Sequence, residues 1–382
     1  MKVFLRYMLL IVLSLSSLMA QAQTHSSKKV RVGIMLPLHN INGDGTRMVE
    51  YYRGVLMAIE DLKKQGVSVD VRAWNVPEDA DVVKLVLKDG TTDCDIIFGP
   101  LYSVQVKILA DFCRAYDVKM VIPFSISNNE VENNAYIYQV YQRPTDLEKS
   151  AIDAFVNRFA ESQDNHFIFI DCADPQSTKG NFTSQLRQRL ESLGLTYNLT
   201  SVNTPLEQFA KAFAGNQQNI IVLNSEKSPA LNKVYKKLDE LQANYQNVHV
   251  TMYGYTDWMM YEKYNTEKYF RYDTYIPTTH YFNEASVKTR ELLSRYRSAF
   301  ETDMQYALPH FALTGYDQAM FFISGVLTYG KKFTGSKWQA PKLPAAIETP
   351  YKFERTAKGG FINKSFMLIH YKPSRQIESL AY

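Results

Sequence analysis

The sequence predicts an α/β protein built from two doubly wound, Rossmann-like lobes. Two observations carry this prediction. Short apolar runs rich in β-branched residues alternate with helical patterns from Val30 onward, and the same alternation starts again after Arg143. Strands separated by single helices form right-handed βαβ units, which build a parallel sheet covered by helices on both faces. We therefore expect one such sheet on each side of Arg143.

The first lobe is expected to begin with the buried strand "VRVGIML". Apolar positions at helical spacing follow from Met48 to Leu62, and Gly66 then ends this helix. Further helices are expected near 79–90 and 104–116. The strands of this lobe are expected at 30–36, 69–76, 94–100 and 119–125.

The second lobe repeats the pattern without a Gly/Ser-rich linker before it. Its strands are expected at 166–172, 196–202, 219–224 and 248–255, and its helices near 146–160, 181–193, 205–214 and 229–243. Two later helices, near 284–301 and 310–329, are expected to return to the first lobe. The segment "GGFINKSFMLIHYK" at 359–372 is interpreted as a terminal hairpin or ribbon.

The first 22 residues have the pattern of a cleaved secretory signal. Lys2 and Arg6 precede a short apolar run, and Ala20-Gln21-Ala22 supplies a small-residue cleavage site. About a dozen apolar residues are too few to span a hydrocarbon layer of roughly 30 Å. We expect an exported, periplasmic protein that is cleaved near Ala22 and has no membrane insertion after that cleavage.

Composition and motifs exclude several classes of function. The 43 Lys and Arg residues are scattered, which argues against nucleic acid as a partner. The odd set Cys94, Cys113 and Cys172 is interpreted as buried free thiols, with a Cys94–Cys113 disulfide as the alternative. The chain has no catalytic motif, and its seven histidines are isolated, so we expect no enzyme, no metal and no cofactor.

Polar residues follow three expected strands of the first lobe. A loop that follows such a strand offers hydroxyls and backbone N–H groups near a helix start, which suits a bound carboxylate. A single loop of this kind is ordinarily a turn with a capping serine. Three at successive strand ends favour a binding site. The residues concerned are His39 after the first strand, Tyr102 and Ser103 after "IIFGP", and Ser125 and Ser127 after "MVIPF".

Five segments, in order, resemble the type I periplasmic binding proteins, nearest the branch that includes the branched-chain amino acid receptors. They are "VRVGIMLPL", "IIFGPLYS", "MVIPFSIS", "YQVYQRP" and "LTGYDQAMFF". The resemblance runs from Val30 to about Lys372. It implies two lobes that close around a small ligand, joined by three crossovers. Lobe one would be 30–141 completed by 281–334, and lobe two 142–280 completed by 335–382.

The resemblance also implies ligand-binding residues. The positions matching Ser103, Ser125 and Ser127 hold the ligand carboxylate in amino-acid receptors of this kind. Ser225 and the "YGYTDW" strand end, which carries Asp257, would approach from the second lobe. One departure is that His39-Asn40 stands where the family usually has Ser-Gly.

The expected function is that of a non-catalytic, exported solute-binding protein. Its ligand would be a small polar solute such as an amino acid, and its partner an ABC permease. The alternative is a cell-wall-associated interaction or regulatory protein, with a cell-wall component as partner. This alternative rests on the resemblance to envelope proteins that carry the receptor fold near peptidoglycan.

Overall fold

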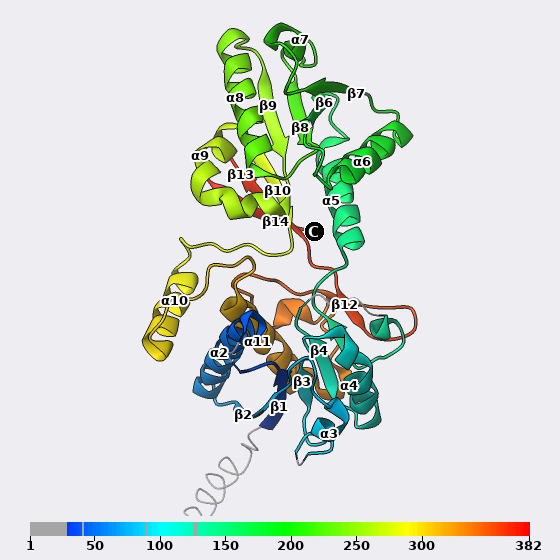
Figure 1. Cartoon of the computed structure of the whole chain (residues 1–382), viewed down its shortest axis with the longest axis vertical. Helices are drawn as coiled ribbons and strands as arrows, with labels where there is room; N and C mark the ends of the chain where they lie inside the picture. Colours follow the sequence, from blue (N-terminus) through cyan, green and yellow to red (C-terminus); the bar gives the residue numbers. More distant parts are fainter. Residues whose placement is uncertain (1–28, 40–41, 89, 125–128) are drawn as a thin grey trace, which may run out of the picture.

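The computed structural model describes residues 29–39, 42–88, 90–124 and 129–382. The predicted signal at 1–22 and the candidate residues Ser125 and Ser127 lie outside the described residues. Two lobes, each built on a seven-stranded sheet, are stacked along the long axis of the molecule (Figure 1). The predicted architecture of two α/β lobes is confirmed.

The lobe-one sheet is parallel except at one edge. Its strands are β1 (Lys29–Leu36), β2 (Ser68–Asn75), β3 (Ile96–Phe98), β4 (Lys119–Ile122), β5 (Ile137–Gln139), β11 (Phe353–Arg355) and β12 (Phe361–Asn363). They lie in the order β11-β12-β5-β4-β3-β1-β2, with β11 antiparallel to β12. The strands β1, β3 and β4 carry buried apolar residues on both faces, as a sheet between two helical layers requires.

Helices cover both faces of this sheet. They are α2 (Gly43–Lys64), α3 (Val82–Val86), α4 (Ser103–Ala115), α10 (Val287–Phe300) and α11 (Phe311–Tyr329), with 3₁₀ turns at Glu130–Glu132, Gly330–Lys332 and Ala340–Lys342. α2 and α11 pack on the face that carries Ile34 and Phe98, whereas α3 and α4 pack on the face that carries Met35 and Ile97. The side chain of Asn42 caps α2 by accepting from Gly45 N at 2.8 Å.

The lobe-two sheet has the same plan with an antiparallel ribbon at one edge. Its strands are β6 (Asn165–Asp171), β7 (Tyr197–Ser201), β8 (Gln218–Leu223), β9 (His249–Tyr253), β10 (Thr274–Thr278), β13 (Met367–Tyr371) and β14 (Ile377–Ala381). The order is β14-β13-β10-β9-β8-β6-β7, and β13 runs antiparallel to both of its neighbours.

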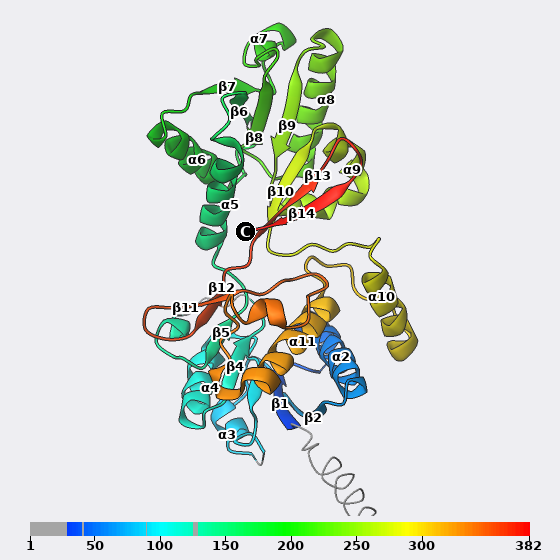
Figure 2. The same ribbon diagram turned by 180° about the vertical axis from the view of Figure 1, so that it is seen from behind.

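The helices of lobe two also form two layers. They are α5 (Pro144–Phe159), α6 (Gly180–Ser192), α7 (Leu206–Ala210), α8 (Ser228–Asn244) and α9 (Glu262–Arg271), with a 3₁₀ helix at Thr256–Tyr261. Figures 1 and 2 show α5 and α6 on one side of the sheet and α8 and α9 on the other. Phe155 of α5 packs edge-on against Tyr253 of β9, which joins that helical layer to the sheet.

The chain passes between the lobes three times. It leaves lobe one after β5, returns to it between β10 and α10, and leaves it again between β12 and β13. The first and third passages are short, at 140–143 and 364–366. The two lobes are therefore joined by three neighbouring segments of chain.

The segment 335–382 is divided between the lobes, which corrects the expectation that it completes lobe two. β11 and β12 belong to the lobe-one sheet, because β12 pairs with β5 through Phe361 and Ile362. Only β13 and β14 join lobe two. For the same reason 359–372 is not a hairpin: its two strands, β12 and β13, lie in different sheets.

The three cysteines are buried and free, as the sequence predicted. Burial raises the pKa of the Cys94 thiol to about 11 and that of Cys172 to about 12. It also raises the pKa of Cys113. None of the helices in the described ranges is both long and apolar enough to cross a membrane.

Candidate functional site

The carboxyl ends of the parallel strands in each lobe point toward the other lobe. β5 and β10 both end where the chain crosses between the lobes, and the strands parallel to them end on the same side (Figure 1). Ligands of open α/β sheets bind beyond these carboxyl ends. The loops after β1, β2 and β3 in lobe one therefore face the loops after β6, β8 and β9 in lobe two.

The lobe-one loops enclose a cavity of about 540 Å³. Its lining includes His39 after β1, Asn75 at the end of β2, and Tyr102 after β3. Three carboxyl-bearing residues also line it, namely Asp44, Glu78 and Asp79. We call this group of loops the lobe-one rim. This group of acidic residues was not predicted from the sequence.

Tyr102 is held in this wall by an acidic neighbour. Its hydroxyl donates to Asp44 Oδ2 at 3.0 Å, and Arg47 pairs with the other oxygen of Asp44 at 2.5 Å. Burial, with the hydrogen bond to Asp44 as the second cause, raises the pKa of Tyr102 to about 12. Tyr102 therefore stays a neutral phenol whose position is set from α2.

Gly99, in the "IIFGP" strand end, has a structural reason to be glycine. Its φ is +138°, and a Cβ placed on it would lie 2.1 Å from Met35 O of the neighbouring strand β1. Gly99 N also donates to Val121 O of β4 at 2.9 Å. The close approach that requires glycine here is between strands and not toward a ligand.

The other predicted residues of lobe one take different positions. Ser103 is exposed as the first residue of α4, and its hydroxyl makes no hydrogen bond within the described part of the chain. His39 is exposed, and its backbone N donates to Asn75 Oδ1 at 3.1 Å. Leu38 N donates to the same oxygen at 2.7 Å, so Asn75 fixes the loop that carries His39.

Ser225 lies beneath the lobe-two rim, the loops after β6, β8 and β9. It is fully buried, and its Oγ donates to Asp174 Oδ2 at 2.8 Å. Lys227 Nζ lies 3.2 Å from the other oxygen of that carboxylate. The hydrogen bond from Ser225, together with Lys227, lowers the pKa of Asp174. Ser225 thus orients Asp174, and its buried hydroxyl is already engaged.

Asp257 lies at the surface of the same rim. Its carboxylate is 3.1 Å from Lys179 Nζ, and its side chain is 45% exposed. Lys179 Nζ also lies 5.0 Å from the ring centre of Tyr255. Glu226, which follows β8 on the same rim, accepts from Ser177 Oγ at 2.9 Å. Asp257 and the more buried Lys179 thus form a charged pair at this rim.

The structure thus brings the predicted residues into two groups. His39 and Tyr102 line one cavity with Ser103 beside it, and Ser225 and Asp257 belong to the lobe-two rim. Within the described ranges no hydrogen bond or ion pair joins the two rims. The missed acids Asp44, Glu78 and Asp79 stand in "NGDGT" and "VPEDAD". Both stretches follow strand ends, so the same strand-end argument could have found them.

No family model matches the sequence, and no curated protein matches it. Solved structures do match the chain. A putative branched-chain amino acid ABC transporter protein from Rhodospirillum rubrum aligns with a TM-score of 0.59 at 12% identity, over 92% of this chain and 100% of that chain. A branched-chain amino acid ABC transporter periplasmic ligand-binding protein from Burkholderia xenovorans LB400 aligns with a TM-score of 0.51 at 15% identity, over 92% and 94%.

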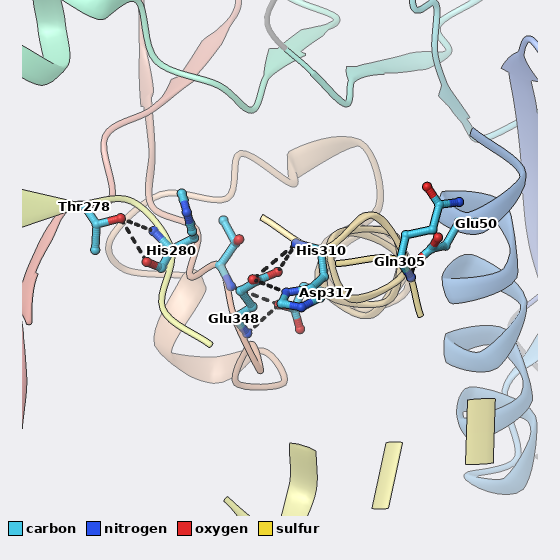
Figure 3. Close-up of polar contacts among 8 residues, drawn as sticks. Glu50, Thr278, His280, Gln305, His310, Asp317 and Glu348 are labelled. Carbon is cyan, nitrogen blue, oxygen red and sulfur yellow. Dashed lines mark hydrogen bonds and ion pairs between the residues drawn. The ribbon is translucent and has the colours of Figure 1, made fainter. Parts of the chain in front are cut away.

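The chain has the type I periplasmic binding protein fold. In this fold the three crossovers are the joint between the lobes, and a buried polar cluster surrounds the second of them (Figure 3). Glu348 is at its centre, with a fully buried side chain. Its carboxylate accepts from His310 N at 3.0 Å and lies 3.0 Å from His310 Nδ1. Its backbone oxygen accepts from Tyr281 N at 2.9 Å, which ties the second crossover to lobe one.

Asp317 of α11 holds the loop that carries Glu348. Its buried carboxyl accepts three backbone N–H groups, from Ile347 at 2.7 Å, Glu348 at 2.8 Å and Thr349 at 3.0 Å. Burial raises the pKa of Asp317 to about 7, although the three hydrogen bonds act in the opposite direction. The anchor of the second crossover therefore depends on a carboxyl inside lobe one.

His280 lies in the second crossover and is also buried. Its Nε2 has no hydrogen-bond partner among the described residues. Burial, with the positive charge of His310 as a smaller cause, lowers the pKa of His280 to about 4. In the folded protein His280 is neutral at pH values where an exposed histidine takes up a proton.

Acidification is expected to destabilise the protein through His280. Its folded pKa of about 4 lies below the value of about 6.5 for an exposed histidine, so the unfolded chain binds more protons between these values. Stability is therefore lost as the pH falls through this window. From about pH 7 to about pH 5 the loss from this one group is about 2 kcal/mol. Urea unfolding at the two pH values measures it.

The variant His280→Leu isolates this contribution. The carboxyls of Glu50, Asp317 and Glu348 have raised pKa values and act in the opposite direction, in the variant as in the wild type. The loss on acidification should be about 2 kcal/mol smaller in His280→Leu. In His249→Leu, which alters an exposed histidine, the loss on acidification should equal that of the wild type. Equal losses in the wild type and His280→Leu would show that His280 is protonated in the folded state.

Proposed function

We propose that this protein is a non-catalytic solute-binding protein that closes its two lobes around a small polar ligand. The observation that carries the proposal is the pair of polar rims at facing strand ends, joined by three neighbouring crossovers. Closure brings the second rim into contact with a ligand already held by the first, so the closed state is populated only when ligand is present.

The ligand we propose is an amino acid held across lobe one. Its ammonium group would face the acidic wall formed by Asp44, Glu78 and Asp79, all of which line one cavity. Its carboxylate would lie at the start of α4, where Ser103 offers a free hydroxyl and the helix offers unpaired backbone N–H groups. The ion pair of Lys179 and Asp257 would meet both charges on closure.

We further propose that the protein is exported, with cleavage near Ala22, and delivers its ligand to an ABC permease in the periplasm. Support comes from the basic and apolar pattern of 1–22 and from the two neighbours, both of which are ABC transporter proteins. Ser125 and Ser127 remain proposed ligand contacts, since they follow β4 in the sequence.

Native mass spectrometry of the protein as purified, followed by thermal shifts with each of the twenty L-amino acids, tests this function. A bound small molecule, or one amino acid that raises the melting temperature, is expected. Small-angle scattering should then show a smaller radius of gyration with that amino acid. If no amino acid has an effect while peptidoglycan sacculi retain the protein, the solute-binding proposal fails and a wall-associated role replaces it.

Ser103→Ala is expected to weaken binding of that amino acid by about tenfold to a hundredfold. A hydrogen bond to a charged group contributes about 1.5–3 kcal/mol, and about 1.4 kcal/mol is one decade in affinity. Stability should not change, because Tyr102 and not Ser103 is the N-cap residue of α4. Calorimetric titration of the wild type, Ser103→Ala and the exposed-serine control Ser298→Ala measures the effect. Unchanged affinity in Ser103→Ala removes this residue from the site.

A further inference from the structure

Lobe one contains a second cavity, at the end of its sheet that points away from lobe two. Its volume is about 610 Å³, within the range of roughly 300–1,000 Å³ that small-molecule pockets occupy. Val30 near the start of β1 and Lys119 at the start of β4 both line it, which places it at the amino ends of the strands. It is therefore separate from the lobe-one rim.

Lys119 lines this cavity without an ion pair to any carboxylate of the described residues. Within that part of the chain, the Nζ atom of this half-buried side chain makes two long contacts, 3.4 Å to Lys331 O and 3.5 Å to Phe333 O. The nearby carboxylate of Asp117 is already paired with Lys331 at 2.9 Å. Burial lowers the pKa of Lys119 to about 8, so the ammonium form is poorly compensated where it lies.

Arg355 supplies a second cation to the same cavity. Its Nε donates to Gly359 O at 3.1 Å, and no ion pair to a carboxylate is found for it among the described residues. The other charges of the wall are compensated, since Lys29 pairs with Asp70 at 3.2 Å and Asp95 pairs with the Arg31 side chain at 3.5 Å. Among the described residues that line the cavity, Lys119 and Arg355 are thus the cations without an ion pair.

Buried aromatic rings form the floor of the cavity beside the two cations. Tyr138 of β5 stacks on Phe361 of β12 with ring centres 4.7 Å apart, and both residues line the cavity. The register places Arg355 opposite Phe361 and Phe361 opposite Tyr138, so these three lie in one row across the sheet. Lys119 Nζ lies 5.8 Å from the Tyr138 ring centre on the other flank.

We propose that this cavity is a second binding site, for a small organic anion with an apolar or aromatic body. Lys119 and Arg355 hold the anionic group, a carboxylate or a phosphate, which removes their uncompensated charge. The body of the ligand packs on the half-buried Val326 and Leu327, which also line the cavity, and on the edge of Phe361. Because all these residues belong to lobe one, occupation of this site does not require closure of the lobes.

Pyridoxal phosphate, an anionic aldehyde, tests the site directly. The Lys119 amine attacks the aldehyde carbon to form an imine with release of water, and borohydride then delivers hydride to give a stable secondary amine. Peptide mapping should find Lys119 modified at about tenfold lower reagent concentration than the exposed Lys107, because the anion site concentrates the reagent. Phenyl phosphate should protect Lys119 and leave Lys107 reactive.

The variant Arg355→Met separates an anion site from a merely reactive amine. Labelling of Lys119 by pyridoxal phosphate should fall by about tenfold, because one partner of the phosphate is lost. Methylation of Lys119 by the neutral reagent formaldehyde with cyanoborohydride should not change, and the exposed-arginine variant Arg189→Met should behave as the wild type. Equal labelling in Arg355→Met, or no protection by phenyl phosphate, overturns the site.

Calorimetry separates the contribution of the ligand's apolar body to the affinity from the contribution of its charge. Phenyl phosphate should bind the wild type more tightly than inorganic phosphate does, and Lys119→Met should bind neither. Equal affinities for the two probes would contradict the packing of the ligand body on the apolar wall of the cavity. These outcomes do not depend on the amino-acid site, since Ser103→Ala should retain phenyl phosphate binding.

Discussion

Gly54→Ala is expected to destabilise lobe one by about 3 kcal/mol, because α2 and α11 touch through their backbones at this point. A Cβ on Gly54 would lie 1.9 Å from Ala312 O. One helical turn further along the same contact, a Cβ on Gly315 would lie 2.0 Å from Tyr51 O. Neither obstacle is a flexible side chain, so the two helices must separate. Urea unfolding followed by circular dichroism measures the loss.

Gly180→Ala is the matched control for this prediction. Gly180 is also a helical glycine, the first residue of α6, and nothing lies within 4 Å of the place its Cβ would take. This variant should be as stable as the wild type or more stable by up to about 1 kcal/mol, because alanine restricts the unfolded chain. A similar loss in both variants would show that the helix contact tolerates a methyl group.

Asp317→Ala is expected to lose about 3–4 kcal/mol, because three buried or half-buried backbone donors lose the carboxylate that accepts their hydrogen bonds. Each unsatisfied buried donor costs about 1–3 kcal/mol, and relaxation of the loop recovers part of that sum. Amide hydrogen exchange at Ile347, Glu348 and Thr349 should accelerate together. Unfolding and exchange of the variant, compared with the wild type, test both statements.

Asp303→Ala provides the comparison for Asp317→Ala. Asp303 is exposed and pairs with Arg297 at 2.6 Å on the surface of lobe one. Surface pairs of this kind contribute about 0–1 kcal/mol, so this variant should differ little from the wild type. If Asp317→Ala lost no more than Asp303→Ala, or if exchange at 347–349 stayed slow, the loop would be held by other contacts.

The alternation of strands and helices was predictable because each strand of these sheets is an apolar run bounded by polar loops. In contrast, the sequence did not predict that β12 and β13 belong to different sheets. The segment 359–372 contains two short apolar runs, 361–362 and 366–369, and both sheets offer an edge. One signal was overlooked: Cβ atoms on Gly359 and Gly360 would lie 2.5 Å and 2.6 Å from the backbone of Asn134. Paired glycines there permit the close packing of β12 onto lobe one.

The candidate site was predictable where position along a strand decides it. His39, Tyr102 and Ser103 lie at strand ends of lobe one, as the patterns of "VRVGIMLPL" and "IIFGPLYS" indicated. Such a pattern does not indicate whether a hydroxyl is buried. Ser225 stands at an equivalent strand end, yet its side chain is fully buried and bonded to Asp174. Sequence spacing could not separate an exposed Ser103 from an enclosed Ser225.

The three buried thiols have a practical consequence for measuring whether the lobes move relative to each other. Maleimide dyes react with thiolate, and buried cysteines with raised pKa values offer almost none at neutral pH. The natural cysteines can therefore stay in place. New cysteines at exposed positions of the two lobes, such as Lys84 and Glu161, would take a donor and an acceptor dye. Energy transfer between them would follow opening and closing in single molecules, with both rims left unmodified.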